Sequence, residues 1–167
     1  LNSLAHTIDP TRQTIIRRCD FCKDIPDVYS PSIWAGWYSG SYKDYTKMIE
    51  NNIDKVNRFF HAEWGGDSHS HRHSEEKFMG FVGNKNGDWS ETYMIHLFDW
   101  CLKEQEKMPN LTGSAFWTFR DFSTPIRPEN PIPYVNQKGV VERNGTPKES
   151  YYVFQSYFSD VSKQSLS

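Results

Sequence analysis

Short apolar runs alternate with longer segments of helical periodicity along this 167-residue chain. The short runs are rich in β-branched and aromatic residues and are bounded by turn-forming residues, which is typical of strands. They predict four strands, at 14–18, 27–32, 58–63 and 113–119. Apolar residues recur every three or four positions over 42–56 and 89–106, so both of these segments are predicted to be helices.

A third helix is predicted near the C-terminus, because its start carries a strong capping signal. Thr146 stands at the N-cap, Pro147 at the first helical position and Glu149 where it closes a capping box. A Pro-rich loop over 124–133 precedes this segment. Residues 159–167 continue no apolar pattern, so we expect one domain over 1–158, followed by a tail or linker.

Strands that alternate with helices favour an α/β fold with a parallel sheet. The candidate chemical residues follow the strands, as they do in a (β/α)8 TIM barrel, whose active site lies at the carboxyl ends of its strands. Only about four strand–helix units are present, whereas a closed barrel has eight. The sequence therefore predicts half of a TIM barrel, with an uncovered sheet edge.

Composition and charge argue against two classes of partner. The formal net charge is -2 and no basic stripe stands out, so nucleic acid is not expected. No apolar run approaches the roughly 18 residues of a membrane span, and the chain begins at Leu1 without a signal peptide. The mean hydropathy is -0.75, yet 16% of residues are aromatic. Aromatic faces stack on sugars as well as fill cores, so this balance fits a site-bearing piece of a larger protein.

Two clusters contain potential metal ligands. Cys19 and Cys22 have the spacing of a redox or zinc pair, but no second pair accompanies them, and two small residues at the end of a strand explain them more simply. Three histidines within 69–73, near Asp67 and Glu75, lack a distant fourth ligand and make a poor tetrahedral site. The sequence predicts no metal and no cofactor.

Glu63 ends the predicted strand at 58–63 and precedes Gly65 and Gly66, where the backbone can turn sharply. A carboxylate in this place suits attack on the anomeric carbon of a sugar. The alternative is a surface glutamate at the start of a loop, which is the commoner role of such a residue.

Four segments together carry a more specific signal. They are Ile-Trp-Ala-Gly-Trp-Tyr at 33–38, Arg-Phe-Phe-His-Ala-Glu-Trp-Gly-Gly-Asp at 58–67, Gly-Ser-Ala-Phe-Trp-Thr-Phe-Arg-Asp-Phe at 113–122, and the segment 136–148, which begins Asn-Gln-Lys-Gly. In this order and at these separations they resemble the catalytic barrel of glycoside hydrolase family 2, which includes β-galactosidases, β-glucuronidases and β-mannosidases. The resemblance spans about 1–158 and implies the second half of the barrel, about strands 5 to 8.

The resemblance implies roles for individual residues. Glu63 matches the nucleophile at the end of the seventh strand, and Trp117, on the eighth, matches the tryptophan that forms a wall of the sugar subsite. Trp34 falls where the family often has a tyrosine, which favours stacking over a hydroxyl contact. Tyr38 ends the same Gly-Trp-Tyr pattern, where a buried structural tyrosine is an equal alternative.

Further substrate contacts are implied by the same resemblance. Asn136 and Lys138 match the Asn-x-Lys with which glucuronidases of this family hold a carboxylate, although relatives with neutral substrates also have Asn-x-Lys-Gly. The remaining predicted contacts, which include the loop residues expected to bind sugar hydroxyls, are Asp67, His69, Arg120 and Asp121.

The mechanism implied is a two-step displacement. Glu63 forms a glycosyl-enzyme while a second carboxylic acid about 5 Å away protonates the leaving oxygen. The family's acid/base glutamate lies in an Asn-Glu pair on the fourth strand, and no Asn-Glu occurs upstream of Glu63. We therefore expect a fragment that is marginally stable and inactive by itself, with the N-terminal half of the barrel as its missing partner.

The function predicted first is an exo-acting, retaining β-galactosidase, because the His-rich Glu-Trp-Gly-Gly-Asp segment resembles galactosidases of bacteria that degrade agar and other algal polysaccharides. Its substrate would be a β-galactoside or related oligosaccharide, with a periplasmic or secreted location compatible with the parent enzyme. A β-glucuronidase of the same family is the alternative. An alternative of another class is a non-catalytic carbohydrate-binding module that uses Trp34, Tyr38 and Trp117 as a stacking platform.

Overall fold

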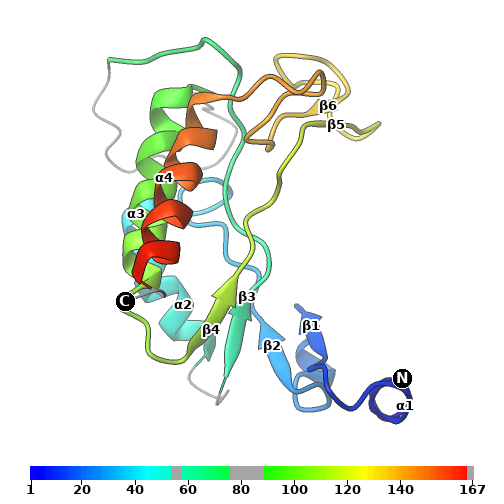
Figure 1. Cartoon of the computed structure of the whole chain (residues 1–167). Coiled ribbons are helices and arrows are strands. Elements are labelled where there is room, and N and C mark those ends of the chain that lie inside the picture. The colour runs from blue at the N-terminus through cyan, green and yellow to red at the C-terminus, as the bar shows by residue number, and fades with distance from the viewer. Residues whose placement is uncertain (54–57, 76–88, 165–167) are drawn as a thin grey trace.

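Four short strands form a parallel sheet in the order β1–β2–β3–β4 (Figure 1). The computed structural model describes residues 1–53, 58–75 and 89–164. The strands of the sheet are β1 (Ile15–Arg17), β2 (Val28–Ser30), β3 (Phe59–His61) and β4 (Leu111–Ser114). Ile15 pairs with Val28, Tyr29 with Phe59, and Phe59 with Leu111. The carboxyl ends of all four strands therefore meet at one edge of the sheet.

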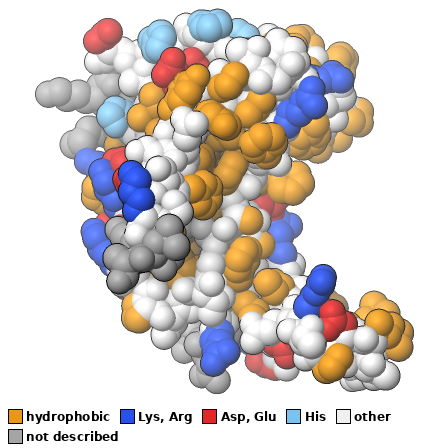
Figure 2. Space-filling view, in the orientation of Figure 1, with side chains coloured by type: hydrophobic (Ala, Val, Ile, Leu, Met, Phe, Trp, Pro, Cys, Tyr) orange, Lys and Arg blue, Asp and Glu red, His pale blue; other side chains and the backbone are white. Residues whose placement is uncertain are grey.

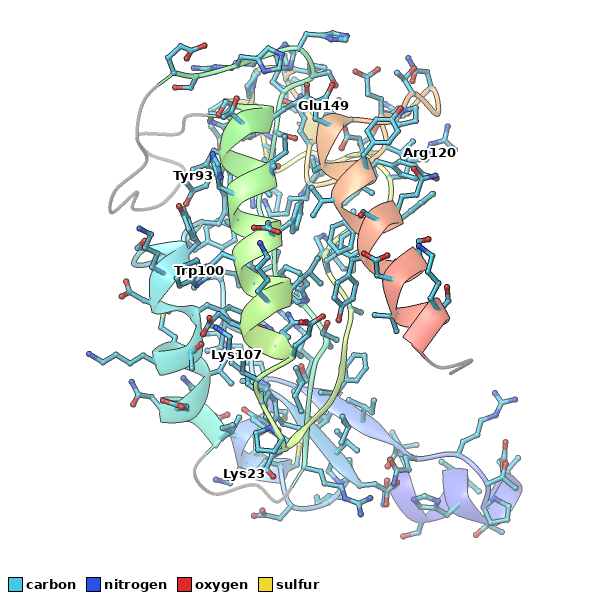
Figure 3. All side chains as sticks on the ribbon, turned by 60° about the vertical axis from the view of Figure 1, so that its left-hand side comes forward. Lys23, Tyr93, Trp100, Lys107, Arg120 and Glu149 are labelled. Atoms are coloured by element: carbon cyan, nitrogen blue, oxygen red, sulfur yellow. The ribbon has the colours of Figure 1, made fainter. Side chains whose placement is uncertain are left out.

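Three helices stand together on one side of this sheet, and α3 and α4 pack side by side along their length (Figures 1 and 3). These three are α2 (Tyr45–Ile53), α3 (Glu91–Gln105) and α4 (Glu149–Gln164), whereas α1 (Asn2–Ile8) lies apart from them at the N-terminus. Two single 3-10 turns, η1 (Asp20–Cys22) and η2 (Tyr42–Asp44), complete the helical elements of the described residues. A separate antiparallel hairpin joins β5 (Phe122–Ser123) to β6 (Val135–Asn136). Within the described part of the chain, no helix combines the length and apolarity that a membrane span needs.

Aromatic side chains build most of the core between the helices and the sheet. Trp64 lies 5.6 Å from Phe98 between ring centroids, and Phe98 lies 4.8 Å from Phe154 on α4. Tyr93 and Trp100 project from α3 toward the side of α2 (Figure 3), where both rings contact Tyr42. Many of the aromatic side chains thus pack in the core, which is the commoner of their two roles.

A buried network of side-chain hydrogen bonds crosses this core and joins α2, β3, α3 and β4. The hydroxyl of Tyr45 lies 2.7 Å from Nδ1 of His61 and accepts a hydrogen bond of 2.8 Å from Nε2 of Gln105. Ser114 donates to Oε1 of the same Gln105 at 2.6 Å. Buried polar groups are tolerated when they bond to one another, so this network fixes the register of the helices on the sheet.

The first three predicted strands are confirmed, and so are the helices at 42–56 and 89–106, although 54–57 lie outside the described residues. The fourth strand is a correction, because β4 begins at Leu111 and ends at Ser114. Beyond it the backbone changes partner: Thr118 donates to the carbonyl of Lys138 at 3.0 Å, and Val140 donates to the carbonyl of Thr118 at 3.2 Å. Residues 118–121 therefore pair with the segment after β6 rather than continue the sheet.

The start of the C-terminal helix is a second correction. Pro147 bridges to Val141, and Lys148 donates to the carbonyl of Val140 at 2.9 Å, so these residues close a hairpin and α4 begins only at Glu149. Thr146 is consequently not the N-cap. Residues 159–164, predicted as a tail, are helical. Neither α1 nor the hairpin β5–β6 was predicted from the sequence.

The protein is expected to become less stable as the pH decreases, because His61 is buried in its neutral form. Burial lowers the pKa of His61 to about 3, whereas an unfolded histidine titrates near 6.5. Between these values the unfolded chain binds more protons, so the free energy of unfolding should decline by up to about 1.4 kcal/mol per pH unit as the pH falls from 6.5 toward 3. Urea unfolding of the wild type and of His61→Gln measures this, and equal pH slopes for the two proteins would contradict it.

Candidate active site

A cavity of about 690 Å³ opens beside the carboxyl ends of the strands. Figure 2 shows the molecule hollowed on this side, with hydrophobic and basic side chains along the hollow. Six of the ten predicted site residues line the cavity: Glu63, Trp34, Tyr38, Trp117, Asn136 and Lys138. Residues predicted from four separate segments of the sequence thus come together around one space.

Glu63 follows β3 and presents its carboxylate to the cavity. The backbone before it is fixed by Ser30, whose hydroxyl accepts a hydrogen bond of 2.8 Å from the amide of Ala62. Only 16% of the Glu63 side chain is exposed, and its carboxylate forms an ion pair with Nε of Arg17 from β1. Burial raises the pKa of Glu63, while Arg17 and Lys138 act in the opposite direction. The carboxylate is therefore partly desolvated but held beside cations.

An aromatic corner forms the next part of the cavity. The rings of Trp34 and Tyr38 meet edge to face with centroids 5.2 Å apart. The turn between them needs Gly36, whose φ is +80° and whose Cα faces the backbone of Tyr42 too closely for a side chain. Tyr38 is 41% exposed and Trp117 is 40% exposed. Both rings therefore offer accessible faces, whereas a buried structural role does not describe Tyr38.

Lys138 joins this corner to the core through a buried ion pair. Its Nζ lies 5.5 Å from the ring centroid of Trp34 and 5.1 Å from that of Tyr38, within cation–π range. The same Nζ pairs with Asp67, which is fully buried and also accepts a hydrogen bond of 3.0 Å from the amide of Gln137. The carboxylate of Asp67 is thus engaged in positioning Lys138, and its contact with sugar hydroxyls stays a prediction.

Asp121 belongs to a second buried pair rather than to the main cavity. Nζ of Lys148 donates to Oδ1 of Asp121 at 3.0 Å, to the carbonyl of Ser68 at 2.8 Å and to the carbonyl of Gln137 at 2.9 Å. Burial raises the pKa of Asp121 to about 6, against the opposing effect of Lys148, and it lowers the pKa of Lys148. These bonds give Asp121 a structural role, and the substrate contact predicted for it stays a prediction.

Gly139 explains why a glycine follows the Asn-x-Lys segment. Its amide donates to Oδ1 of Asp121 at 2.8 Å. A Cβ at this position would lie 2.3 Å from the amide nitrogen of Asp121, a distance that no side chain can adopt. The glycine therefore lets two backbone segments touch, and this contact fixes the backbone next to Lys138.

His69 and Arg120 also lie outside the main cavity. Nδ1 of His69 is 2.9 Å from Nε2 of Gln137, and His69 lines a separate cavity of about 280 Å³. Arg120 donates to the carbonyl of Arg143; in Figure 3 it lies at the end of the molecule that holds Glu149, opposite Lys23. The structure does not bring these two residues to the main cavity, and their substrate contacts stay predictions. Over 1–53, 58–75 and 89–164, no three His, Cys, Asp or Glu side chains gather as metal ligands would.

Sequence reasoning missed three arginines of the cavity, Arg17, Arg18 and Arg127. Arg127 comes from the Pro-rich loop, donates to the hydroxyl of Tyr38 and places its guanidinium carbon 5.6 Å from that ring's centroid. No local pattern around Arg127 marks it, because its partner lies 89 residues away. Arg17 belongs to β1, where the alternation of apolar residues alone drew attention.

The described lining is therefore cationic around a half-buried carboxylate. Besides Glu63, the acidic residue that this lining contains is Asp20, whose Oδ1 accepts a hydrogen bond of 2.5 Å from Tyr29. Burial, together with this bond, raises the pKa of Tyr29 to about 12. Asp20 is occupied as an acceptor, whereas Glu63 faces the cavity with exposed aromatic rings nearby. Such a site suits a nucleophilic carboxylate and an anionic, ring-shaped ligand.

Known proteins resemble this chain over nearly its whole length. A Formosa agariphila protein, provisionally named a β-glucuronidase, is 49% identical over 177 residues that cover 95% of this chain and 22% of the relative. The structure of β-glucuronidase 3 from Bacteroides uniformis is 65% identical with a TM-score of 0.85, covering 93% of this chain and 21% of that one. No family model matches the chain.

A family 2 β-galacturonidase from Eisenbergiella tayi shares the fold alone, with 21% identity and a TM-score of 0.72 over 95% of this chain and 29% of that one. The chain thus spans about a fifth of the length of the first two relatives. The relatives are glycoside hydrolases, and their names support the alternative prediction, β-glucuronidase, rather than the first prediction, β-galactosidase.

Replacing Lys148 should destabilise the fold far more than replacing an exposed lysine of the same helix region. Lys148→Met removes three hydrogen bonds and leaves Asp121 buried without its cation, a change that costs about 3–5 kcal/mol. Lys163→Met is the control, because that side chain is 73% exposed and pairs only with exposed Asp160. Urea unfolding measures both, and comparable midpoints for the two variants would contradict the structural role of Lys148.

Removing Arg17 should raise the pKa of Glu63 further. Arg17 lowers this pKa against the effect of burial, so Arg17→Gln leaves burial less opposed. NMR titration of the side-chain carboxyl, assigned by its loss in Glu63→Gln, measures the shift. Arg12→Gln, which removes only an exposed pair with Asp9, should leave the Glu63 titration unchanged. An unchanged or lower Glu63 pKa in Arg17→Gln would show that the ion pair does not act as described.

Proposed function

We propose that this chain, which is homologous to one segment of β-glucuronidases and resembles glycoside hydrolase family 2, is the nucleophile-bearing part of a retaining β-glucuronidase. The observation that carries the proposal is the cavity itself, where Glu63 stands among Arg17, Arg127 and Lys138. A uronic acid carries a carboxylate that needs cations, whereas a galactoside is neutral. The charge of the cavity thus supports the same substrate class as the names of the relatives.

The proposed roles divide the lining into three parts. Glu63 attacks the anomeric carbon, and its ionised form is favoured by Arg17. Trp117 and Tyr38 stack on the sugar ring with their exposed faces. Lys138 and Arg127, which lie 5.1 Å and 5.6 Å from the centroid of the Tyr38 ring, hold the substrate carboxylate. Because Lys138 is partly neutralised by Asp67, Arg127 supplies the more available charge of the two.

The proposed reaction has two displacements. Glu63 first displaces the leaving group and forms a glycosyl-enzyme, which water then hydrolyses. The acid that protonates the leaving oxygen must lie about 5 Å from the nucleophile; Asp20, the other acidic residue of the described lining, already accepts from Tyr29. We therefore propose that the acid/base belongs to a segment outside these 167 residues.

The proposed architecture of the parent follows from the same sheet. About residues 1–158 would supply β1–β4 as strands 5 to 8 of a (β/α)8 barrel, with the hairpin β5–β6 and its loop over the carboxyl ends. The parallel pairing and the placement of the cavity at those ends support this arrangement. In such a barrel, β1 would pair with the strand that precedes it in the parent.

The first test compares activities of the parent enzyme and of this chain. The full-length parent should hydrolyse an aryl β-glucuronide with at least about a hundredfold higher kcat/KM than the matching β-galactoside or β-mannoside. The 167-residue chain should show no turnover of an aryl glucuronide with an activated leaving group. A parent that prefers the galactoside would overturn the substrate, and turnover by the chain that Glu63→Gln abolishes would overturn the missing acid/base.

The cations are tested separately in the parent. Arg127→Gln should lower kcat/KM for the aryl glucuronide by about ten- to a hundredfold while leaving the matching aryl glucoside nearly unchanged, because only the glucuronide has a carboxylate to lose a partner. Lys138→Gln should act in the same direction. Lys138 is buried with Asp67, so Lys138→Gln can fail to fold. In that case the variant of Arg127, a half-buried residue, decides. Equal losses on both substrates would contradict carboxylate recognition.

A further inference from the structure

Two cysteine thiols touch one another beside the cavity and take no part in the proposed reaction. Sγ of Cys22 donates a hydrogen bond to Sγ of Cys19 across 2.9 Å. The backbone repeats this closure, because the amide of Cys22 donates to the carbonyl of Cys19 at 3.0 Å. The two side chains are half-exposed, whereas Cys101, the third cysteine, is buried in the core.

The turn geometry suits a covalent bond between the two sulfurs. The backbone hydrogen bond from Cys22 to Cys19 closes a turn between positions i and i+3, and such a turn keeps its end Cα atoms within about 7 Å. Disulfides join Cα atoms about 4.4–6.8 Å apart, so closure of this turn requires little backbone movement. The sequence alone left three interpretations of the Cys19–Cys22 spacing open: a redox pair, a zinc pair or two small residues. The contact between the two sulfurs favours the redox pair.

We propose that Cys19 and Cys22 form a redox-active dithiol in the turn beside the cavity, which a small-molecule disulfide oxidises reversibly to an intramolecular disulfide. The proposal is independent of the proposed glycosidase activity, because it rests on the thiols of this turn. Metal binding is disfavoured, since no third ligand accompanies the two sulfurs among the described residues.

The hydrogen bond sets the order of the chemistry. Cys22 is the donor of this hydrogen bond and Cys19 the acceptor, so we assign the first attack on the oxidant to Cys19, after it has lost its proton to water. One thiolate of the oxidant leaves, and a mixed disulfide forms on Cys19. Cys22 then loses its proton and attacks the Cys19 sulfur of the mixed disulfide, and the second thiolate of the oxidant leaves. Two protein thiols and one small disulfide thus give one protein disulfide and two small thiols.

The position of the turn connects this exchange to the cavity. Arg18 and Asp20, on either side of Cys19, both line the cavity. Arg18 is anchored to β2 by its amide, which donates to the carbonyl of Ser30 at 3.0 Å, and Asp20 is anchored by the hydroxyl of Tyr29. Lys23, the residue after Cys22, marks this end of the molecule in Figure 3. A disulfide would therefore restrain a segment that carries both a cation and a carboxylate of the cavity.

Peptide mapping tests the proposal on the 167-residue chain. Trypsin cuts after Arg18 and Lys23, so peptide 19–23 contains both thiols and no other cysteine. After incubation with oxidised glutathione, this peptide should be lighter by two hydrogen atoms, and dithiothreitol should restore its mass. Cys101 should stay reduced in the same sample and serves as the internal control.

The variants separate intramolecular closure from ordinary surface reactivity. Cys22→Ser cannot close the ring, so a glutathione adduct on Cys19 should accumulate at least about tenfold more than in the wild type. Cys19→Ser should form an adduct on Cys22 more slowly than Cys22→Ser forms one on Cys19. Equal adduct levels in the wild type and Cys22→Ser, or a wild-type peptide that carries glutathione without losing hydrogen, would overturn the proposal. Zinc bound through both thiols and blocking oxidation would overturn it too.

Discussion

The ammonium group of Lys148 is the interaction on which the arrangement of the cavity depends. Its three donors all find acceptors, which are the carboxylate of Asp121 and the backbone carbonyls of Ser68 and Gln137. An ammonium buried in this way is costly unless every donor is bonded, so the three segments that supply the acceptors can adopt few other positions. The loop after β3, the segment after β4 and the segment after β6 are thereby fixed around one atom.

A second buried pair converts this frame into a binding site. Asp67 lies next to Ser68 in the loop that Lys148 holds, and its carboxylate orients Lys138 toward the rings of Trp34 and Tyr38. The two lysines thus have different functions, although the sequence places them only ten positions apart: Lys148 stabilises the fold, whereas Lys138 lines the cavity. Glu63 depends on the same frame, because the loop tied down by Lys148 begins directly after it.

Local periodicity predicted the elements that pack by apolar faces, which are β1, β2, β3, α2 and α3. It could not locate the end of β4, because the competing backbone partner at Lys138 follows twenty residues after Thr118 and after an unpredicted hairpin. The same limit applied to the site. Asp67 and Asp121 are predicted from the sequence only as substrate contacts, and their buried ion pairs were missed, since the lysines that pair with them lie 71 and 27 residues away. Arg127 was missed for the same physical reason, whereas Glu63, Trp117 and Lys138 were identified because a family resemblance carries long-range information that periodicity lacks.

The central claim, that Glu63 is the nucleophile of a β-glucuronidase, is tested most directly by trapping the glycosyl-enzyme in the full-length parent. A 2-deoxy-2-fluoro-glucuronyl fluoride slows both displacements, since fluorine destabilises an oxocarbenium-like transition state, while its good leaving group lets the first step proceed. We expect a stable adduct on Glu63, found by mass spectrometry in the tryptic peptide 59–72, and no adduct in Glu63→Gln. An adduct on another carboxylate, or trapping by the galactosyl but not the glucuronyl reagent, would contradict it.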